Sequence, residues 1–591
     1  MFPMPRHPKP SIALLSLLLI CQPGCAPRKT GEEQTDSQQR RAIFTDELSI
    51  QHGQELFNQY CAACHNFETA EIGPNLSGVT SEESKEWLVS FIQNAPHMIE
   101  SGDHKAVRLF NTYKQYMPAF PTLKPEDIEH LLAFIHRFSE GQKKSRKYRP
   151  GALLNPLPER VLAGDLTLVL EKMLTLPASA EVPPLARINK LLAMETGQGE
   201  RLFIHDLRGR LYEITNNIPR TYLDVAQEIP PFIHLPGYGT GMGSFAFHPD
   251  FEHNGLLYTT HNESAGSAPA DFAYDDPARV DLQWVLVEWK TADSRAGAFS
   301  GTRRELLRAN MYSPVHGFQE LTFNPLAKPG GKDYGMLYLG VGDGGAGITH
   351  PHLCHDTGRI WGTVVRIDPA GSNSKNGRYG IPADNPFVQR PDALGEVWAY
   401  GFRNPHRITW DLTGSEKMFI TNIGQHSIEE VNIGMPGADY GWPEREGTFV
   451  FDAEANTEVV YPLPREDPES FVYPVAQYDH DDGNAISGGF VYAGDDIPLL
   501  RDKYIFGDIP RGKVFYAKVS EMEKGRQAPV YEVGVEVAGR KTDLKSLAQN
   551  NRVDLRFGQD SKGDLFIFTK ADGALWKVVD AKRSDGSTPA E

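Results

Sequence analysis

The spacing of apolar residues changes along this chain. Around residues 54–60, 87–92 and 125–138, apolar side chains recur every three or four positions, which is the period of an amphipathic helix. From about residue 160 onward the apolar residues come in short strings that end in Asp, Gly or Thr, a pattern typical of β-strands separated by turns. The pattern predicts a multidomain protein with a small all-α domain followed by a larger all-β domain.

Six of the apolar strings recur at intervals of roughly 55 to 85 residues, longer than the ~40–45 residues of a minimal propeller blade. The 55 Gly and 43 Pro of the chain add frequent turns. These features predict a six-bladed β-propeller with long loops over residues 161–580, and a pair of β-sandwiches is the less regular alternative. The strings are residues 202–204, 256–258, 337–339, 418–420, 504–506 and 565–567.

The N-terminal segment is typical of an export signal. Arg6 and Lys9 precede the apolar run 12–20, which is too short to span a bilayer as a helix. We therefore expect residues 1–25 to be a signal peptide and the mature protein to be exported to the periplasm. Residues 26–45 are polar and predict a flexible tether.

Cys25 follows Gly24 and precedes a polar stretch, as in a bacterial lipoprotein signal whose cysteine is lipidated. That pattern predicts a membrane tether through Cys25. Gln22 and Pro23 match such signals poorly, and Cys21 competes with Cys25. Cleavage without lipidation, giving an untethered periplasmic protein, stays open.

Charge and cysteine content narrow the function. The 591 residues exceed a single domain on a prior of about 150 residues per domain. A net charge of −17 argues against nucleic-acid binding. Five cysteines provide no disulfide framework, and Cys354 has no role that the sequence suggests.

The string Cys61-Ala62-Ala63-Cys64-His65 is the most specific motif of the chain. Two thiols at this spacing attach a haem covalently, and the adjacent imidazole reaches its iron. A zinc site would need two further ligands, and no second cysteine pair follows. The motif predicts haem c bound through Cys61 and Cys64, with His65 on the iron.

Residues 46–139 resemble a class I cytochrome c domain. Besides the attachment motif they contain Gly-Pro-Asn-Leu at 73–76, Met-Pro at 117–118 and a closing apolar helix that starts at Pro125. The resemblance implies that His65 and Met117 are the axial ligands of the haem iron. Met98 is the rival sixth ligand.

Residues 140–160 are basic near 143–149 and predict a solvated linker between the two domains. Beyond them, seven strings occur in order over some 400 residues. By these strings the region is similar to the glucose/sorbosone dehydrogenase family, whose members are quinoprotein propellers, and we expect residues 581–591 to form a disordered tail. The strings are residues 246–251, 340–345, 365–368, 379–387, 400–405, 437–443 and 487–492.

Enzymes of this family oxidise the C1 hydroxyl of aldoses with pyrroloquinoline quinone (PQQ), while a histidine takes the hydroxyl proton. The resemblance implies that His316 is that general base, and a neutral imidazole titrates near the working pH. Arg403 and Asn404 match the family's pair beside the quinone, where an Arg can stabilise developing negative charge. The alternatives are that His316 has only a structural role and that Arg403 forms an ion pair with a carboxylate.

The resemblance also implies further cofactor contacts. Gly424 and Gln425 match residues whose backbone carbonyls hold Ca²⁺, which prefers oxygen ligands. Arg552 and Arg511 lie near cofactor-binding positions of the family, and His480 is a candidate for the rim of the site.

Two departures from the family pattern bear on the function. Thr240 stands where a glutamine is expected, and Pro510 stands where a lysine is expected, so glucose specificity does not transfer. The leading hypothesis is a periplasmic haem-coupled PQQ dehydrogenase that oxidises a sugar or sugar-like alcohol and passes electrons to a respiratory carrier. The alternative is a non-enzymatic propeller that binds a glycan or a protein and carries an electron-transfer cytochrome. A dehydrogenase with NAD or FAD is disfavoured, because no dinucleotide fingerprint is present.

Overall fold

In the computed structural model, most of the first 43 residues lie outside the described part of the chain. The predicted signal peptide, with Cys21 and Cys25, and Cys64 of the haem motif are among those outside. Within the described residues, no helix is both long enough and apolar enough to cross a membrane. The described residues are 43–62, 65, 67, 73–113, 117–120, 123–141, 150–158, 161–181, 183–235, 238–274, 280–348, 350–453, 456–467 and 470–583.

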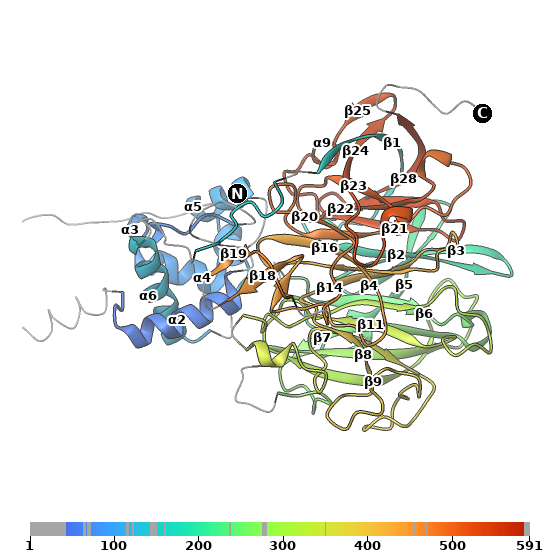
Figure 1. Cartoon of the computed structure of the whole chain (residues 1–591), viewed down its shortest axis with the longest axis horizontal. Coiled ribbons are helices and arrows are strands. Elements are labelled where there is room, and N and C mark those ends of the chain that lie inside the picture. The colour runs from blue at the N-terminus through green and yellow to red at the C-terminus, as the bar shows by residue number, and fades with distance from the viewer. Residues whose placement is uncertain are drawn as a thin grey trace, which may run out of the picture. The chain divides into compact units, whose positions relative to one another are not determined.

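The first described region is helical, as the apolar spacing predicts. Asp46 caps the first helix by accepting a hydrogen bond from the Ser49 amide at 2.9 Å. That helix packs closely on the last helix of the region, since a Cβ atom on Gly53 would lie 1.9 Å from the His130 carbonyl oxygen. The helices, drawn in blue to teal in Figure 1, are α2 (Glu47–Tyr60), α3 (Val79–Glu82), α4 (Lys85–Glu100), α5 (His104–Tyr113) and α6 (Pro125–Gly141).

The second region is almost entirely β-structure. Among its described residues, four antiparallel sheets have four strands each, and three of these use strands that are consecutive in the chain. Their strands are β2 (Ile188–Thr196), β3 (Gly199–Asp206), β4 (Arg210–Thr215), β5 (Ile218–Asp224), β6 (Met242–Phe247), β7 (Leu256–Ser264), β8 (Leu282–Thr291), β9 (Gly301–Met311), β10 (Phe318–Phe323), β11 (Leu337–Val341), β12 (Thr363–Ile367), β13 (Val397–Tyr400), β14 (Pro405–Trp410), β15 (Met418–Asn422), β16 (Ile428–Ile433) and β20 (Ala476–Asp479).

A nine-stranded sheet joins the end of the chain to the start of this region. Strand β1 (Leu162–Thr175) pairs in parallel with β24 (Tyr531–Val537) and antiparallel with β28 (Ala574–Arg583), and in Figure 1 the teal β1 lies among these red strands. Strand β28 runs three residues past the boundary expected at 580. The other members are β21 (Ile486–Val491), β22 (Lys503–Asp508), β23 (Val514–Lys518), β25 (Arg540–Thr542), β26 (Leu555–Gln559) and β27 (Leu565–Thr569), and a separate three-stranded sheet contains β17 (Arg445–Glu446), β18 (Phe449–Asp452) and β19 (Asn456–Tyr461).

Strands β2, β6, β10, β14, β21 and β26 form a closed cycle of contacts, which we call the ring. A hydrogen bond joins each neighbouring pair and links residues at corresponding positions along the two strands, as when the strands run in the same direction. The bonds are Asn189 to the Gly243 carbonyl (3.3 Å), Leu321 amide to Ser244 (3.2 Å), Arg407 to Glu320, Thr409 to the Gly489 carbonyl (3.1 Å), Ser487 to the Leu555 carbonyl (2.9 Å) and Arg556 to Asn189 (2.9 Å).

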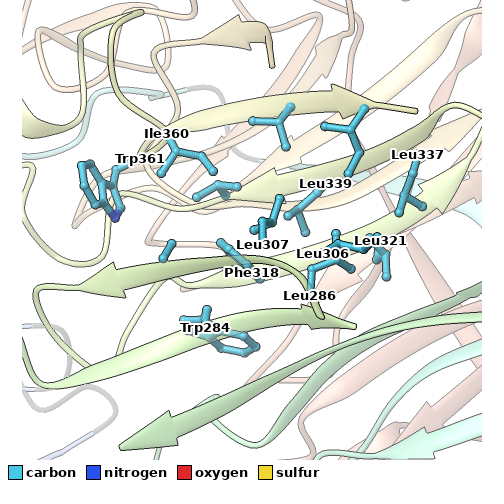
Figure 2. Close-up of a cluster of buried hydrophobic side chains, with 14 of the residues drawn as sticks. Trp284, Leu286, Leu306, Leu307, Phe318, Leu321, Leu337, Leu339, Ile360 and Trp361 are labelled. Carbon is cyan, nitrogen blue, oxygen red and sulfur yellow. The ribbon is translucent and has the colours of Figure 1, made fainter. Parts of the chain in front are cut away.

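Apolar side chains fill the space between neighbouring sheets. The largest cluster lies between the sheet of β6–β9 and that of β10–β13, and Figure 2 shows Trp284 and Leu307 of the first sheet together with Phe318 and Leu339 of the second. Burial of such side chains is the main favourable term in folding. Because the sheets pack face to face in this way, the ends of the ring strands are left to polar residues.

The segment before β1 is bonded to the β region, although the sequence predicts a solvated linker over 140–160. The Leu153 amide donates to the Val460 carbonyl at 2.9 Å. The Leu157 amide donates to Asp479 at 3.3 Å, and the Val161 amide donates to Asp482 at 2.8 Å. Leu153, Leu157 and Val161 therefore have defined positions, because each of their peptide amides has a specific partner.

Candidate active site

An apolar pocket in the helical region brings together the predicted haem ligands. Cys61, His65 and Met117 line it, with about 1000 Å³ of empty space among side chains from α4, α5 and α6. The rival Met98 is not part of the pocket lining, although Met98 and Met117 both pack against the cluster of Phe91. The geometry fits a haem, and the axial roles of His65 and Met117 stay predictions.

The His65 ring is held in one orientation. Its Nδ1 lies 2.9 Å from the Pro74 carbonyl oxygen, which leaves Nε2 as the nitrogen for a metal. Gly73 makes room for this ring, because a Cβ atom there would lie 2.4 Å from His65 Cε1. Burial lowers the pKa of His65, and the Pro74 contact opposes that shift. A neutral imidazole is the form that binds iron.

The second site forms where the ring strands begin, and we call this end the ring entrance. His316 lies two residues before β10, Arg403 lies two residues before β14, and Arg552 lies three residues before β26. Since the six strands run in the same direction, these residues share one end of the ring. His316, Asp343, Arg403 and Gln425 all line one pocket with about 300 Å³ of empty space.

His316 is fixed by its backbone and by a carboxylate. It has a left-handed φ of 50°, and its Nδ1 lies 2.8 Å from Asp343 Oδ1. Asp343 also accepts from the Gly345 amide at 2.8 Å and from Trp442 Nε1 at 3.0 Å. This carboxylate therefore orients the imidazole so that Nε2 is the nitrogen left for a substrate.

Burial lowers the pKa of His316, and the nearby Arg403 cation lowers it further, while Asp343 raises it. The net direction favours the neutral imidazole at neutral pH. Asp343 is itself held ionised, because contact with His316 and Arg403 outweighs burial and lowers its carboxyl pKa. A neutral imidazole beside an ionised carboxylate is the arrangement that a general base requires.

Arg403 lines the same pocket as His316, and Arg403 and Asn404 are held by different hydrogen bonds. Arg403 Nε donates to Gln425 Oε1 at 2.8 Å, and its Nη1 donates to the Ile423 carbonyl at 3.2 Å. The Asn404 amide donates to Asn422 Oδ1 at 2.9 Å. Asn404 Oδ1 is buried without a partner among the described residues, so this oxygen is an acceptor for a ligand.

The loop of Gly424 and Gln425 is organised by Glu446. One carboxylate oxygen, Glu446 Oε1, accepts the four backbone amides of residues 425–428 at 2.7 to 3.1 Å. Within the described part of the chain, no group of three or more His, Cys, Asp or Glu side chains is placed to hold a metal ion. Calcium at the carbonyls of Gly424 and Gln425 stays a prediction.

Three further predicted residues, Arg511, Arg552 and His480, do not line this pocket. Arg511 donates to Asn484 Oδ1 at 2.9 Å and to the carbonyls of Asp481 and His480 at 2.8 and 2.9 Å. Arg552 pairs with Asp554 at 2.9 Å. His480 Nε2 lies 3.0 Å from buried Glu429. Arg511 therefore stabilises a loop of the ring entrance.

The two departures from the family pattern both have structural roles. The Thr240 hydroxyl accepts from the Leu235 amide at 2.8 Å and so closes its own loop. The Pro510 carbonyl accepts from the Val553 amide at 3.1 Å. Each residue stabilises a turn at the ring entrance.

The ring entrance also contains several buried cations that the sequence did not indicate. Burial lowers the pKa of Arg187 to about 10 and that of Arg556 to about 9, and it lowers the pKa of Lys570 strongly. Asp554 is the carboxylate whose charge opposes all three shifts. An excess of buried positive charge fits an anionic ligand with several carboxylates. These cations are single residues in ordinary strand contexts, so no local motif indicates them.

Asp343 was also missed, although the sequence contained a signal. It stands between Gly342 and Gly344 in the string at 340–345. A Cβ atom on Gly342 would lie 2.2 Å from the His316 carbonyl oxygen, so this glycine permits the approach of the two loops. An acidic residue set among such glycines is a candidate orienting residue.

Comparisons with known proteins agree with this architecture. Residues 50–139 match the Cytochrome c family model. Human Hedgehog-interacting protein is 24% identical over 415 residues, which cover 66% of this chain and 51% of that protein. Aldose sugar dehydrogenase YliI of Escherichia coli K12 is 26% identical over 249 residues, which cover 41% of this chain and 57% of the relative.

The chain spans about half the length of the curated relatives it matches. Among solved structures, the PQQ-bound form of aldose sugar dehydrogenase from Streptomyces coelicolor is 19% identical, with a TM-score of 0.45, and covers 70% of this chain and 97% of that one. The Glucose / Sorbosone dehydrogenase family model matches residues 189–577, which is more than half of the chain. This protein therefore belongs to the glucose/sorbosone dehydrogenase family and carries a cytochrome c domain ahead of the family domain.

Proposed function

We propose that this protein is a haem-linked quinoprotein dehydrogenase that oxidises a sugar or sugar-like alcohol. The observation that carries the proposal is the convergence of His316, Asp343 and Arg403 on one pocket at the ring entrance. The family and the cytochrome c domain support it. The closed ring of six strands supports a six-bladed propeller, in which the nine-stranded sheet contains two blades and β1 completes the last one.

The residues at the ring entrance fit PQQ, because the cations Arg187, Arg552, Arg556 and Lys570 suit its carboxylates and Asn404 offers an unpartnered oxygen. When bound, PQQ supplies the two-electron acceptor of an alcohol oxidation. The His316 imidazole takes the hydroxyl proton at Nε2, while Asp343 holds the ring and stabilises the imidazolium. Arg403 places positive charge on the same pocket wall.

The cytochrome domain supplies the onward electron path in this proposal. His65 and Met117 hold the haem iron, and Cys61 and Cys64 attach the haem covalently. Methionine ligation raises the potential of a haem relative to bis-histidine ligation, which suits an electron acceptor. We further propose Ca²⁺ at Gly424 and Gln425, export to the periplasm, a tether through Cys25 and a respiratory carrier as final acceptor.

One comparison favours a second function. Hedgehog-interacting protein matches two thirds of this chain, so the β domain is also compatible with a protein- or glycan-binding role. The absence of the family's glutamine at Thr240 and of its lysine at Pro510 also favours a binding role. In that case His316 and Asp343 would serve only to hold the loops of the ring entrance.

A single experiment separates the two functions. The exported protein is supplied with PQQ and Ca²⁺, and its haem absorption band is followed after aldoses and alcohols are added. We expect reduction of the haem that requires PQQ and substrate together and disappears in His316→Ala. Absence of haem reduction across a broad panel, in a protein with an intact haem spectrum, would favour the binding role.

A further inference from the structure

The last turn of α2 carries a side chain that leaves its own domain. Gln59 is 7% exposed, and its Nε2 donates to the carbonyl of Tyr312 at 2.8 Å. Tyr312 follows strand β9 and lies four residues before His316. A residue of the cytochrome domain is thus bonded to the segment that leads to the proposed general base.

The same side chain lines the pocket of His316, Asp343 and Arg403. Its amide donor is used by Tyr312, and no hydrogen bond among the described residues is assigned to Gln59 Oε1. An amide oxygen on the wall of a polar pocket is an acceptor for a hydroxyl group. Sugars and sugar-like alcohols present such groups at several positions.

Other contacts hold this turn in place. The Tyr60 hydroxyl donates to Asp281 Oδ1 at 3.1 Å, and Tyr60 is itself 7% exposed. Phe120 meets the Tyr238 ring edge to face at a centroid distance of 6.2 Å. Tyr238 belongs to the ring entrance, since its carbonyl accepts from Arg187 at 2.5 Å.

We propose that the cytochrome domain forms a fixed wall of the substrate pocket, and that Gln59 is a specificity-determining residue that accepts a hydrogen bond from the sugar. The proposal rests on the proposed dehydrogenase function. Gln59 lies two residues before Cys61, so substrate recognition and haem attachment share one helix turn. The helical domain then has a second role beside electron transfer.

The chain offers a matched control on the same helix. Gln54 is exposed, whereas Gln59 is buried against the pocket, so Gln54→Ala and Gln59→Ala make the same chemical change in two environments. Both variants are made in the full-length holoprotein. Intact haem absorption spectra and unchanged haem reduction potentials establish that the domain is folded in each.

The first measurement tests the docking without reference to activity. Amide hydrogen exchange is followed by mass spectrometry for the peptide that contains the last turn of α2. We expect slow exchange in the wild type and in Gln54→Ala, and faster exchange in Gln59→Ala. Fast exchange of this peptide in the wild type, at the rate of an exposed helix end, would overturn the fixed wall.

The second measurement tests recognition. Binding of xylose, glucose and maltose is measured by calorimetry, and KM and kcat are measured for the same sugars. We expect Gln59→Ala to weaken binding of the best substrate roughly 2- to 10-fold, mainly through a higher KM. The variant should also discriminate less than the wild type against the larger sugar, maltose. Gln54→Ala should match the wild type.

The outcomes separate this inference from the proposed function. If the wild type oxidises sugars and Gln59→Ala keeps the same preference as Gln54→Ala, the role of Gln59 is wrong and the dehydrogenase stands. If the wild type neither binds nor oxidises any sugar, both the dehydrogenase and the recognition role fail, while the exchange result still decides the docking.

Discussion

The two pockets of this protein are lined by side chains of different polarity. The pocket of the helical domain is lined mainly by apolar side chains such as Leu88 and Phe91, with His65 and Met117 among them. The ring entrance is lined by His316, Asp343 and Arg403 and backed by further buried cations. A group attached through thioether bonds needs few charged side chains to hold it. An anionic group that can dissociate needs positively charged side chains around it.

Because the two pockets have different linings, we expect a substitution in one pocket to leave the other pocket unchanged. His316→Ala should lower kcat about 10²- to 10⁴-fold, because it removes the proton acceptor, and should leave the haem spectrum unchanged. Steady-state kinetics and absorption spectra of the same preparation check this. Near-normal turnover would remove His316 from the mechanism, and a changed haem spectrum would contradict the independence.

The ring itself depends on a buried charge network. Lys190 and Arg407 both contact Glu320, which is 1% exposed, and Lys190 also donates to the Leu321 carbonyl at 2.7 Å. Glu320→Gln leaves two cations without their carboxylate and should cost about 3–5 kcal/mol of unfolding free energy. Denaturant unfolding followed by tryptophan fluorescence measures this. Asp392→Asn, at an exposed ion pair, should leave the midpoint unchanged.

The haem pocket offers a test between two methionines. Met117→Ala should lower the haem reduction potential by on the order of 100 mV, because a sulfur ligand is lost. Met98→Ala should leave the potential unchanged, since Met98 does not line the pocket. Redox titration of both variants decides between them. A drop confined to Met98→Ala would reverse the assignment.

The cations of the ring entrance should act on cofactor affinity. Arg187→Gln and Arg552→Gln are each expected to weaken PQQ binding roughly 10-fold or more, because each removes a charged donor. Titration of cofactor-free protein with PQQ measures the change. Arg540→Gln on the exposed strand β25 is the control. Equal affinity in all three variants would place PQQ away from these cations.

The smallest expected effect concerns pH. A general base must be neutral, and burial lowers the pKa of His316 below its ordinary 6.5, so kcat/KM should fall only as pH drops below that value. Asp343 raises this pKa. In Asp343→Asn the acidic inflection should therefore move to lower pH, with a lower plateau from the poorly oriented ring. An inflection that moves to higher pH would contradict the role of Asp343.

The sequence predicted the helical and β regions because their periodicities differ clearly, and it predicted His316 and Arg403 through strings that match the family. It missed Asp343 and Gln59. Asp343 reaches His316 because Gly342 lets two loops approach each other. Gln59 contacts a carbonyl 253 positions further along the chain, a distance that no local pattern can indicate.

The haem attachment motif, the order of the two domains and the strand-forming strings were determined by sequence alone, because covalent chemistry and periodicity depend on neighbouring residues. Only the tertiary structure decided which of two methionines reaches the pocket, which cations gather at the ring entrance and which side chain of α2 lies beside His316. These depend on contacts between residues that are distant in the chain, and at the ring entrance such contacts follow from the closure of the ring.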